Sequence, residues 1–348
     1  MSRFRKTLTA LVWMCLVVSG CGEHRSTWHD PSNHKVQFVT VEDGVRLEVL
    51  DWGGIGRAVV LLAGLGNTAH IFDGFADGLS GPYHVYGITR RGFGASSHPN
   101  DGYGEQRLAE DDLAVLDSLK MASPVLVGHS IAGDELTVIG TQRTERISGL
   151  VYLDAAADPT DDYTQLETLQ QKLPESIQDS PEGGGSPIPP TPSDLASIRG
   201  YQDFQRRTLG VAYPESELRN MFETNPNGSV ALGKYRATGF TVATIRAGGR
   251  KRDYSNIGVP ILAFNWFPLA LEVQIKKYAP KDAEKRAAMA AVYTADASFS
   301  RLRMQNLLTA NAPVHVIEMP GANHYVFITN EADVLRELRA FLGGLPPP

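Results

Sequence analysis

The residues best suited to chemistry in this sequence surround Ser130, which lies in the stretch Gly-His-Ser-Ile-Ala at residues 128–132. An apolar run (125–127) precedes this stretch, and an apolar helical pattern follows it. Gly-x-Ser-x-small between a strand and a helix is typical of a nucleophile elbow, a turn so sharp that larger side chains at Gly128 and Ala132 would clash. Such a strained turn presents the serine hydroxyl to substrate. Ser130 is therefore a candidate nucleophile for acyl transfer.

The elements that must position this serine are indicated by short apolar runs along the chain. Residues 35–42 and 45–49 alternate between apolar and polar types around an Asp-Gly turn, which predicts a β-hairpin. Continuous apolar runs, typical of strands buried on both faces, occupy residues 58–62, 84–88, 125–127, 150–153, 261–264 and 314–317. Helical patterns separate several of these runs. The alternation predicts an α/β fold with a mostly parallel sheet flanked by helices.

One long segment interrupts the alternation. Residues 159–257 contain no clear buried strand, and residues 180–193 are rich in Gly, Pro and Ser. Short helices are expected near residues 163–173 and 194–209. We therefore expect a helical and irregular cap inserted between strands, with the core built from residues 35–158 and 258–348.

Three further motifs give the chain its resemblance to the α/β-hydrolase superfamily. Leu-Leu-Ala-Gly-Leu-Gly (61–66) lies where the family has its strand-to-loop His-Gly segment. Arg-Arg-Gly-Phe-Gly-Ala-Ser (90–96) resembles the family's Asp-x-Arg-Gly-x-Gly-x-Ser loop, with Thr89 in place of the Asp. Pro-Gly-Ala-Asn-His (320–324) resembles the loop that carries the catalytic histidine. Apart from the insertion, the resemblance extends over residues 35–342.

The resemblance implies the other members of the site. It makes His324 the candidate base, and it places the oxyanion hole at the backbone N–H groups of Leu65 and Ile131. No metal or organic cofactor is predicted, because neither an HExxH motif nor a phosphate-binding loop is present.

The acid that orients the histidine is the open question. In the usual layout of the superfamily an acid follows the strand at 260–264, but Asn265 and Trp266 follow it here. Asp154 ends the strand after that of the nucleophile, a position that some superfamily members use. Asp296 has a spacing from the histidine similar to the usual layout. We favour Asp154, keep Asp296 as the alternative acid, and consider Glu272 a distant third.

The resulting hypothesis is a serine hydrolase that cleaves small carboxylic esters through an acyl-enzyme. A lactonase, an amidase or a cofactor-free perhydrolase would use the same three side chains. A non-catalytic binding lipoprotein that has kept the fold is the alternative from another class, and the missing carboxylate after the strand at 260–264 is its best support.

The N-terminus resembles a bacterial lipoprotein export signal. Basic residues precede an apolar run (8–18), and Val-Ser-Gly then precedes Cys21. We therefore expect a signal peptide at residues 1–20, lipidation of Cys21, and a membrane anchor in the bacterial cell envelope. An ordinary signal peptide that contains a cysteine is the alternative. Residues 21–34 are expected to form a solvated tether, whose histidines, including His34, form no recognisable metal-ligand pattern.

Charge and cysteine content exclude other classes. The 348 residues carry 33 Lys and Arg against 39 Asp and Glu, a net charge of −6, without a long basic stripe. Nucleic acid is therefore not an expected partner. Both cysteines lie within the first 21 residues, which excludes a disulfide framework and a thiolate zinc site beyond them. The sequence does not indicate an oligomeric state.

Overall fold

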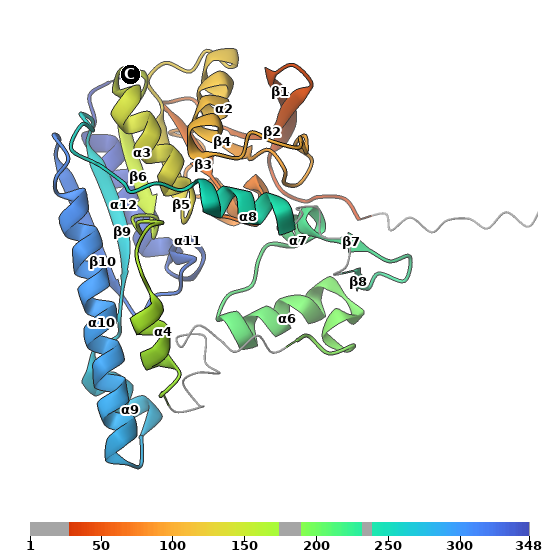
Figure 1. Cartoon of the computed structure of the whole chain (residues 1–348). Coiled ribbons are helices and arrows are strands. Elements are labelled where there is room, and N and C mark those ends of the chain that lie inside the picture. Colours follow the sequence, from red (N-terminus) through yellow and green to blue (C-terminus); the bar gives the residue numbers. More distant parts are fainter. Residues whose placement is uncertain (1–27, 174–188, 232–238, 348) are drawn as a thin grey trace, which may run out of the picture.

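The computed structural model describes residues 28–173, 189–231 and 239–347 (Figure 1). Cys21 and the expected signal peptide lie outside these residues. Eight strands of the described chain form one sheet, in which β1, β2 and β4 pair antiparallel and all other neighbours pair parallel. Across the sheet the strands are β1 (Lys35–Glu42), β2 (Val45–Gly53), β4 (His84–Thr89), β3 (Ala58–Leu62), β5 (Val125–His129), β6 (Gly149–Leu153), β9 (Ile261–Phe267) and β10 (Val314–Pro320).

Helices cover both faces of the sheet (Figure 1). On one face lie η1 (Ala69–Phe72), α1 (Asp73–Asp77), α11 (Val326–Thr329) and α12 (Glu331–Gly344), and on the other lie α2 (Glu105–Ser118), α3 (Ala132–Gln142) and α10 (Ala283–Leu307). Outside the insertion between β6 and β9, the described chain also contains two short elements, η2 (Thr144–Arg146) and α9 (Leu271–Tyr278). The predicted fold class, a mostly parallel sheet flanked by helices, is confirmed.

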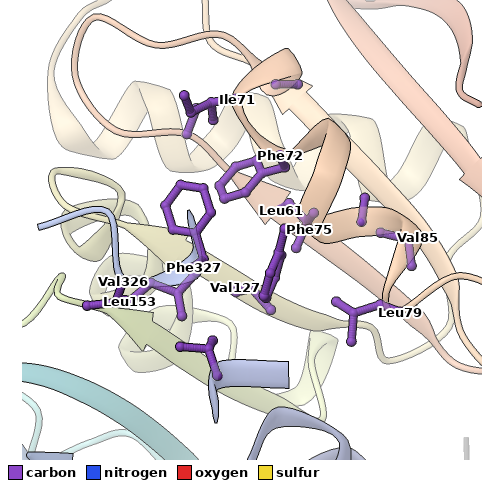
Figure 2. Packing of buried hydrophobic residues seen from close by; sticks show 14 of the residues in the cluster. Leu61, Ile71, Phe72, Phe75, Leu79, Val85, Val127, Leu153, Val326 and Phe327 are labelled. Carbon is purple, nitrogen blue, oxygen red and sulfur yellow. The ribbon is translucent and has the colours of Figure 1, made fainter. Parts of the chain in front are cut away.

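The hydrophobic core consists of two clusters, one on each face of the sheet, because successive residues of a strand point to opposite faces. Leu61 and Val127 belong to the cluster under η1 and α12, whereas their neighbours Leu62 and Leu126 belong to the cluster under α2 and α3. In the first cluster, Phe327 packs its ring 4.7 Å from that of Phe72 (Figure 2). Full burial of such side chains stabilises the fold by about 1.5–3 kcal/mol each.

The insertion between β6 and β9 contains mainly short helices (Figure 1). Its helices near the expected positions are α4 (Thr164–Gln170) and α6 (Ile198–Leu209), and a hairpin of β7 (Glu223–Thr224) and β8 (Val230–Ala231) adds a feature that the sequence did not predict. Its other described elements are η4 (Asp194–Ala196), α7 (Glu215–Met221) and α8 (Gly239–Gly248). Within the described part of the chain, no helix has the length and apolarity needed to cross a membrane.

The segment before β1 differs from its expected solvated state at His34. The His34 side chain is only 4% exposed, and its Nδ1 lies 2.7 Å from Asp73 Oδ1 on α1. The expectation of a solvated histidine here was wrong because its partner comes from an element 39 residues along the chain, which local sequence does not reveal.

Candidate active site

Ser130 occupies a sharp bend between β5 and α3. Its φ of 56° lies in the left-handed region, which a residue other than glycine adopts at a cost. The bend is held because the Ser130 N–H donates to Leu153 O at 3.3 Å and the Gly133 N–H donates to Ser130 O at 3.0 Å. A Cβ at Gly128 would come within 2.9 Å of Leu136. The small residue before the serine is therefore required by packing, as in a nucleophile elbow.

His324 lies in the loop between β10 and α11, next to the bend. Its ring centroid is 4.6 Å from that of His129, the residue before Ser130, and His129 Nε2 lies 3.1 Å from the His324 carbonyl oxygen. Among the described residues, the Ser130 hydroxyl makes no hydrogen bond to His324. Catalytic hydrogen bonds of this kind are often long in free enzymes and shorten when substrate binds.

Asp154 is the carboxylate that the structure brings to His324. His324 Nδ1 lies 2.7 Å from Asp154 Oδ2, and the Trp266 N–H donates to Asp154 Oδ1 at 3.2 Å. Burial alone would raise the pKa of Asp154, but the interaction with His324, together with Arg303 and the Trp266 N–H, lowers it below its usual value. An ionised carboxylate in this position fixes the imidazole so that Nε2 is left for the serine.

The other two candidate acids lie elsewhere. Asp296 is in the middle of α10, and burial raises its pKa to about 6. Glu272 is exposed in the first turn of α9. Neither carboxylate contacts His324 within the described part of the chain.

The proposed oxyanion residues flank the bend. Within the described residues, neither the Leu65 N–H nor the Ile131 N–H donates a hydrogen bond to a protein acceptor. The two side chains pack against a buried cluster that contains Phe93, Leu108 and Ile245 of α8. A Cβ at Gly64 would lie 2.7 Å from His129 Nδ1, so the loop can approach the bend this closely only with glycine there.

A buried carboxylate of the insertion holds the same loop, and sequence reasoning missed it. Glu217 on α7 is fully buried and accepts hydrogen bonds from Asn67 Nδ2 at 2.8 Å and from the Thr68 N–H at 3.0 Å. The Tyr325 hydroxyl, beside His324, donates to Asn67 Oδ1 at 3.0 Å. Burial raises the pKa of Glu217 to about 7. These partners are up to 258 residues apart, and no local motif indicates them.

A buried ion pair anchors the base of the loop. Arg90 donates through Nε and Nη2 to the two carboxylate oxygens of Glu135 on α3, at 2.6 Å each, and through Nη2 to Ala63 O at 3.0 Å. Arg90, the first residue of the motif at 90–96, thus connects the end of β4, the helix after the nucleophile and the residue before Gly64. Such two-pronged pairing fixes geometry as well as charge.

Comparison with known proteins agrees with this architecture. The model of the alpha/beta hydrolase family matches residues 59–337. A non-heme chloroperoxidase, CPO-A1 of Kitasatospora aureofaciens, is 33% identical over 118 residues, which are 33% of this chain and 42% of the relative. An N-formylmaleamate deformylase of Pseudomonas putida is 30% identical over 113 residues, which are 32% of this chain and 42% of the relative. The matches thus span less than half the length of these relatives.

Solved structures resemble the chain over a larger share of its length. The crystal structure of an E-2-(acetamidomethylene)succinate hydrolase covers 89% of this chain and is itself covered completely, with a TM-score of 0.61 and 19% identity. At this identity the likeness concerns the fold alone. On the family match and the shared fold, the chain belongs to the alpha/beta hydrolase family.

Proposed function

We propose that this protein is a serine hydrolase that cleaves carboxylic esters, with Ser130 as nucleophile, His324 as base and Asp154 as the orienting acid. The observation that carries the proposal is the 2.7 Å contact between His324 Nδ1 and Asp154 Oδ2, formed beside a serine on a strained bend. The three side chains come from the ends of β5 and β6 and from the loop after β10, and a serine, a histidine and a carboxylate are the groups that acyl transfer uses.

The reaction would proceed in two halves. Ser130 Oγ attacks the ester carbonyl carbon while His324 Nε2 takes the hydroxyl proton, and the negative charge that forms on the carbonyl oxygen is stabilised by the N–H groups of Leu65 and Ile131. His324 then gives the proton to the departing alcohol, which leaves the acyl group on Ser130. Water, deprotonated by His324, attacks the acyl-enzyme and releases the acid.

A perhydrolase is the second candidate, supported by the similarity to proteins named as non-heme chloroperoxidases. Hydrogen peroxide would then replace water in the attack on the acyl-enzyme and give a peracid. A lactonase or amidase would use the same residues, and the similarity to a deformylase supports the amidase. A binding protein without activity remains the alternative from another class.

We also propose that the protein is exported and anchored in the bacterial cell envelope through a lipid on Cys21. The basic n-region, the apolar run and the small residues before Cys21 support this. Replacing Cys21 by Ser should move the protein from the membrane fraction to the soluble fraction of an expressing cell. Unchanged membrane retention would refute the lipid anchor.

The test of activity is a panel of p-nitrophenyl esters of graded chain length, assayed with the wild type, Ser130→Ala and a matched control, Ser298→Ala on an exposed turn of α10. We expect Ser130→Ala to lose about 10⁶-fold in kcat and the control to match the wild type. Adding hydrogen peroxide and assaying peracid separates perhydrolysis from hydrolysis. Ester turnover that survives in Ser130→Ala would assign the chemistry to another group, and no turnover of any ester or amide would favour the binding protein.

A further inference from the structure

A second cluster of chemically capable side chains lies where the segment before β1 meets η1 and α1. Asp30 and His34 come from that segment, His70 from η1 and Asp73 from the start of α1. One donor atom of each lies within 4.8 Å of the donor atoms of the other three. None of these residues belongs to the site around Ser130.

His70 is the unusual member of the cluster. Its side chain is only 4% exposed, yet neither ring nitrogen has a hydrogen-bond partner within the described residues. Nδ1 lies 3.8 Å from Asp30 Oδ2 and 3.6 Å from Asp73 Oδ2, and Nε2 lies 3.6 Å from Glu48 Oε1. Buried polar atoms rarely lack partners. Carboxylate oxygens just beyond hydrogen-bond distance of a buried imidazole leave room for an ion between them.

His34 is held as metal-bound histidines usually are. Its Nδ1 lies 2.7 Å from Asp73 Oδ1, while its Nε2 faces Asp30 Oδ2 at 3.8 Å. A carboxylate on one ring nitrogen orients the ring so that the other nitrogen can bind a metal. Asp73 is itself fixed, because its Oδ1 accepts from Trp52 Nε1 at 3.1 Å and its Oδ2 accepts from the Ser216 hydroxyl.

We propose that Asp30, His34, His70 and Asp73 bind one Zn²⁺ ion, which fastens the N-terminal segment to the hydrolase core. Two imidazoles and two carboxylates suit the four-coordinate preference of zinc. Bonds of about 2.0–2.1 Å in a tetrahedron separate the ligand atoms by about 3.3–3.4 Å. Three of the distances between imidazole nitrogens and carboxylate oxygens are 3.6–3.8 Å, and every pair of ligand atoms lies within 4.8 Å, so the cluster must contract by up to about 1.5 Å to reach that spacing.

A proton is the alternative occupant of this cluster. Burial opposes charge on His70, but the carboxylates of Asp73 and Glu48 outweigh burial and raise the pKa of His70 to about 10. Either a protonated imidazole or a zinc ion would compensate the negative charge of the carboxylates. The two states differ in a measurable way, because only the second takes up metal.

The experiment measures zinc directly. The purified full-length protein is stripped with EDTA, supplied with ZnCl₂ and desalted, and its bound zinc is measured by elemental analysis beside its melting temperature. We expect one zinc per chain and a higher melting temperature with zinc. Because even partners of metal ligands change affinity by about 10–100-fold, His70→Gln and Asp30→Asn should each weaken zinc binding by roughly 100-fold or more.

Two controls keep the outcome decisive. His84→Gln removes a histidine that also lies close to a carboxylate, 2.9 Å from Asp51 Oδ1, but outside the cluster, and it should keep full zinc binding. Asp30→Asn alters only the segment before β1, so it remains informative if His70→Gln fails to fold. Wild type without stoichiometric zinc, or Asp30→Asn and His70→Gln that bind zinc as the wild type does, would overturn the proposal.

Discussion

Exchange of Asp154 for Asn tests the assignment that the sequence left open. The substitution preserves the size of a side chain that is only 11% exposed, but it replaces an acceptor that lies 2.7 Å from His324 Nδ1. An amide can present its NH₂ group to Nδ1, which favours the tautomer with the proton on Nε2. That tautomer cannot accept the proton of Ser130. We expect kcat to fall by about 10³–10⁴-fold, equivalent to about 4–5.5 kcal/mol of lost transition-state stabilisation.

The matched control is Asp296→Asn, which removes a half-buried carboxylate. Because burial raises the pKa of Asp296 and the residue does not contact His324, its loss should change kcat by no more than about twofold. Steady-state kinetics on a p-nitrophenyl ester, with circular dichroism to verify folding, provides the measurement. A folded Asp154→Asn variant with near-normal kcat, beside an inactive Asp296→Asn, would show that our choice of acid is wrong.

Three further predictions concern the groups around the site. The pKa of Glu217 rises on folding from 4.5 to about 7. The contribution of Glu217 to the free energy of unfolding therefore decreases as pH increases through this range, by about 3 kcal/mol in total. Urea unfolding at pH 5 and pH 8 should show this loss in the wild type but not in Glu217→Gln, and an equal change with pH in both proteins would contradict the prediction. Arg90→Met should cost about 3–5 kcal/mol in urea unfolding, because it leaves Glu135 charged and unpaired in the interior; a loss below about 1 kcal/mol would mean that the pair does not anchor the loop. Tyr325→Phe removes the hydrogen bond to Asn67 and should lower kcat by about tenfold with little change in KM, whereas a change in KM alone would place the tyrosine in substrate binding.

The fold was predictable because its central strands β3, β5, β6 and β9 are buried on both faces, whereas the edge strand β10 is largely exposed or half-buried. Each continuous apolar run in the sequence corresponds to a strand, and the Asp-Gly turn at Gly44 connects β1 to β2 as expected. The bend at Ser130 was predictable because the small residues that it requires, and the strand and helix on either side of it, are adjacent in sequence. The 25-residue helix α10 was not recognised, because its apolar positions pack against several surfaces and form no single stripe.

The contacts that arise from distant segments were beyond the reach of sequence patterns. Asp154 could only be favoured over Asp296, because the choice depends on how β6 and the loop after β10 meet in space. Glu217 lies in the insertion and reaches the loop after β3 from 149 residues away. His34 looked solvated because its buried partner, Asp73, comes from a separate element. In each case the chemistry depends on tertiary packing rather than on local spacing.

Labelling with a fluorophosphonate, which reacts with activated serines, shows whether Ser130 is the nucleophile. The protein is treated with the probe, digested, and the modified peptide identified by mass spectrometry. We expect one adduct, on Ser130, that is absent from Ser130→Ala and strongly reduced in Asp154→Asn. A wild-type protein that hydrolyses esters while Ser130 stays unlabelled, or that carries the adduct on another residue, would contradict the assignment of Ser130 as nucleophile.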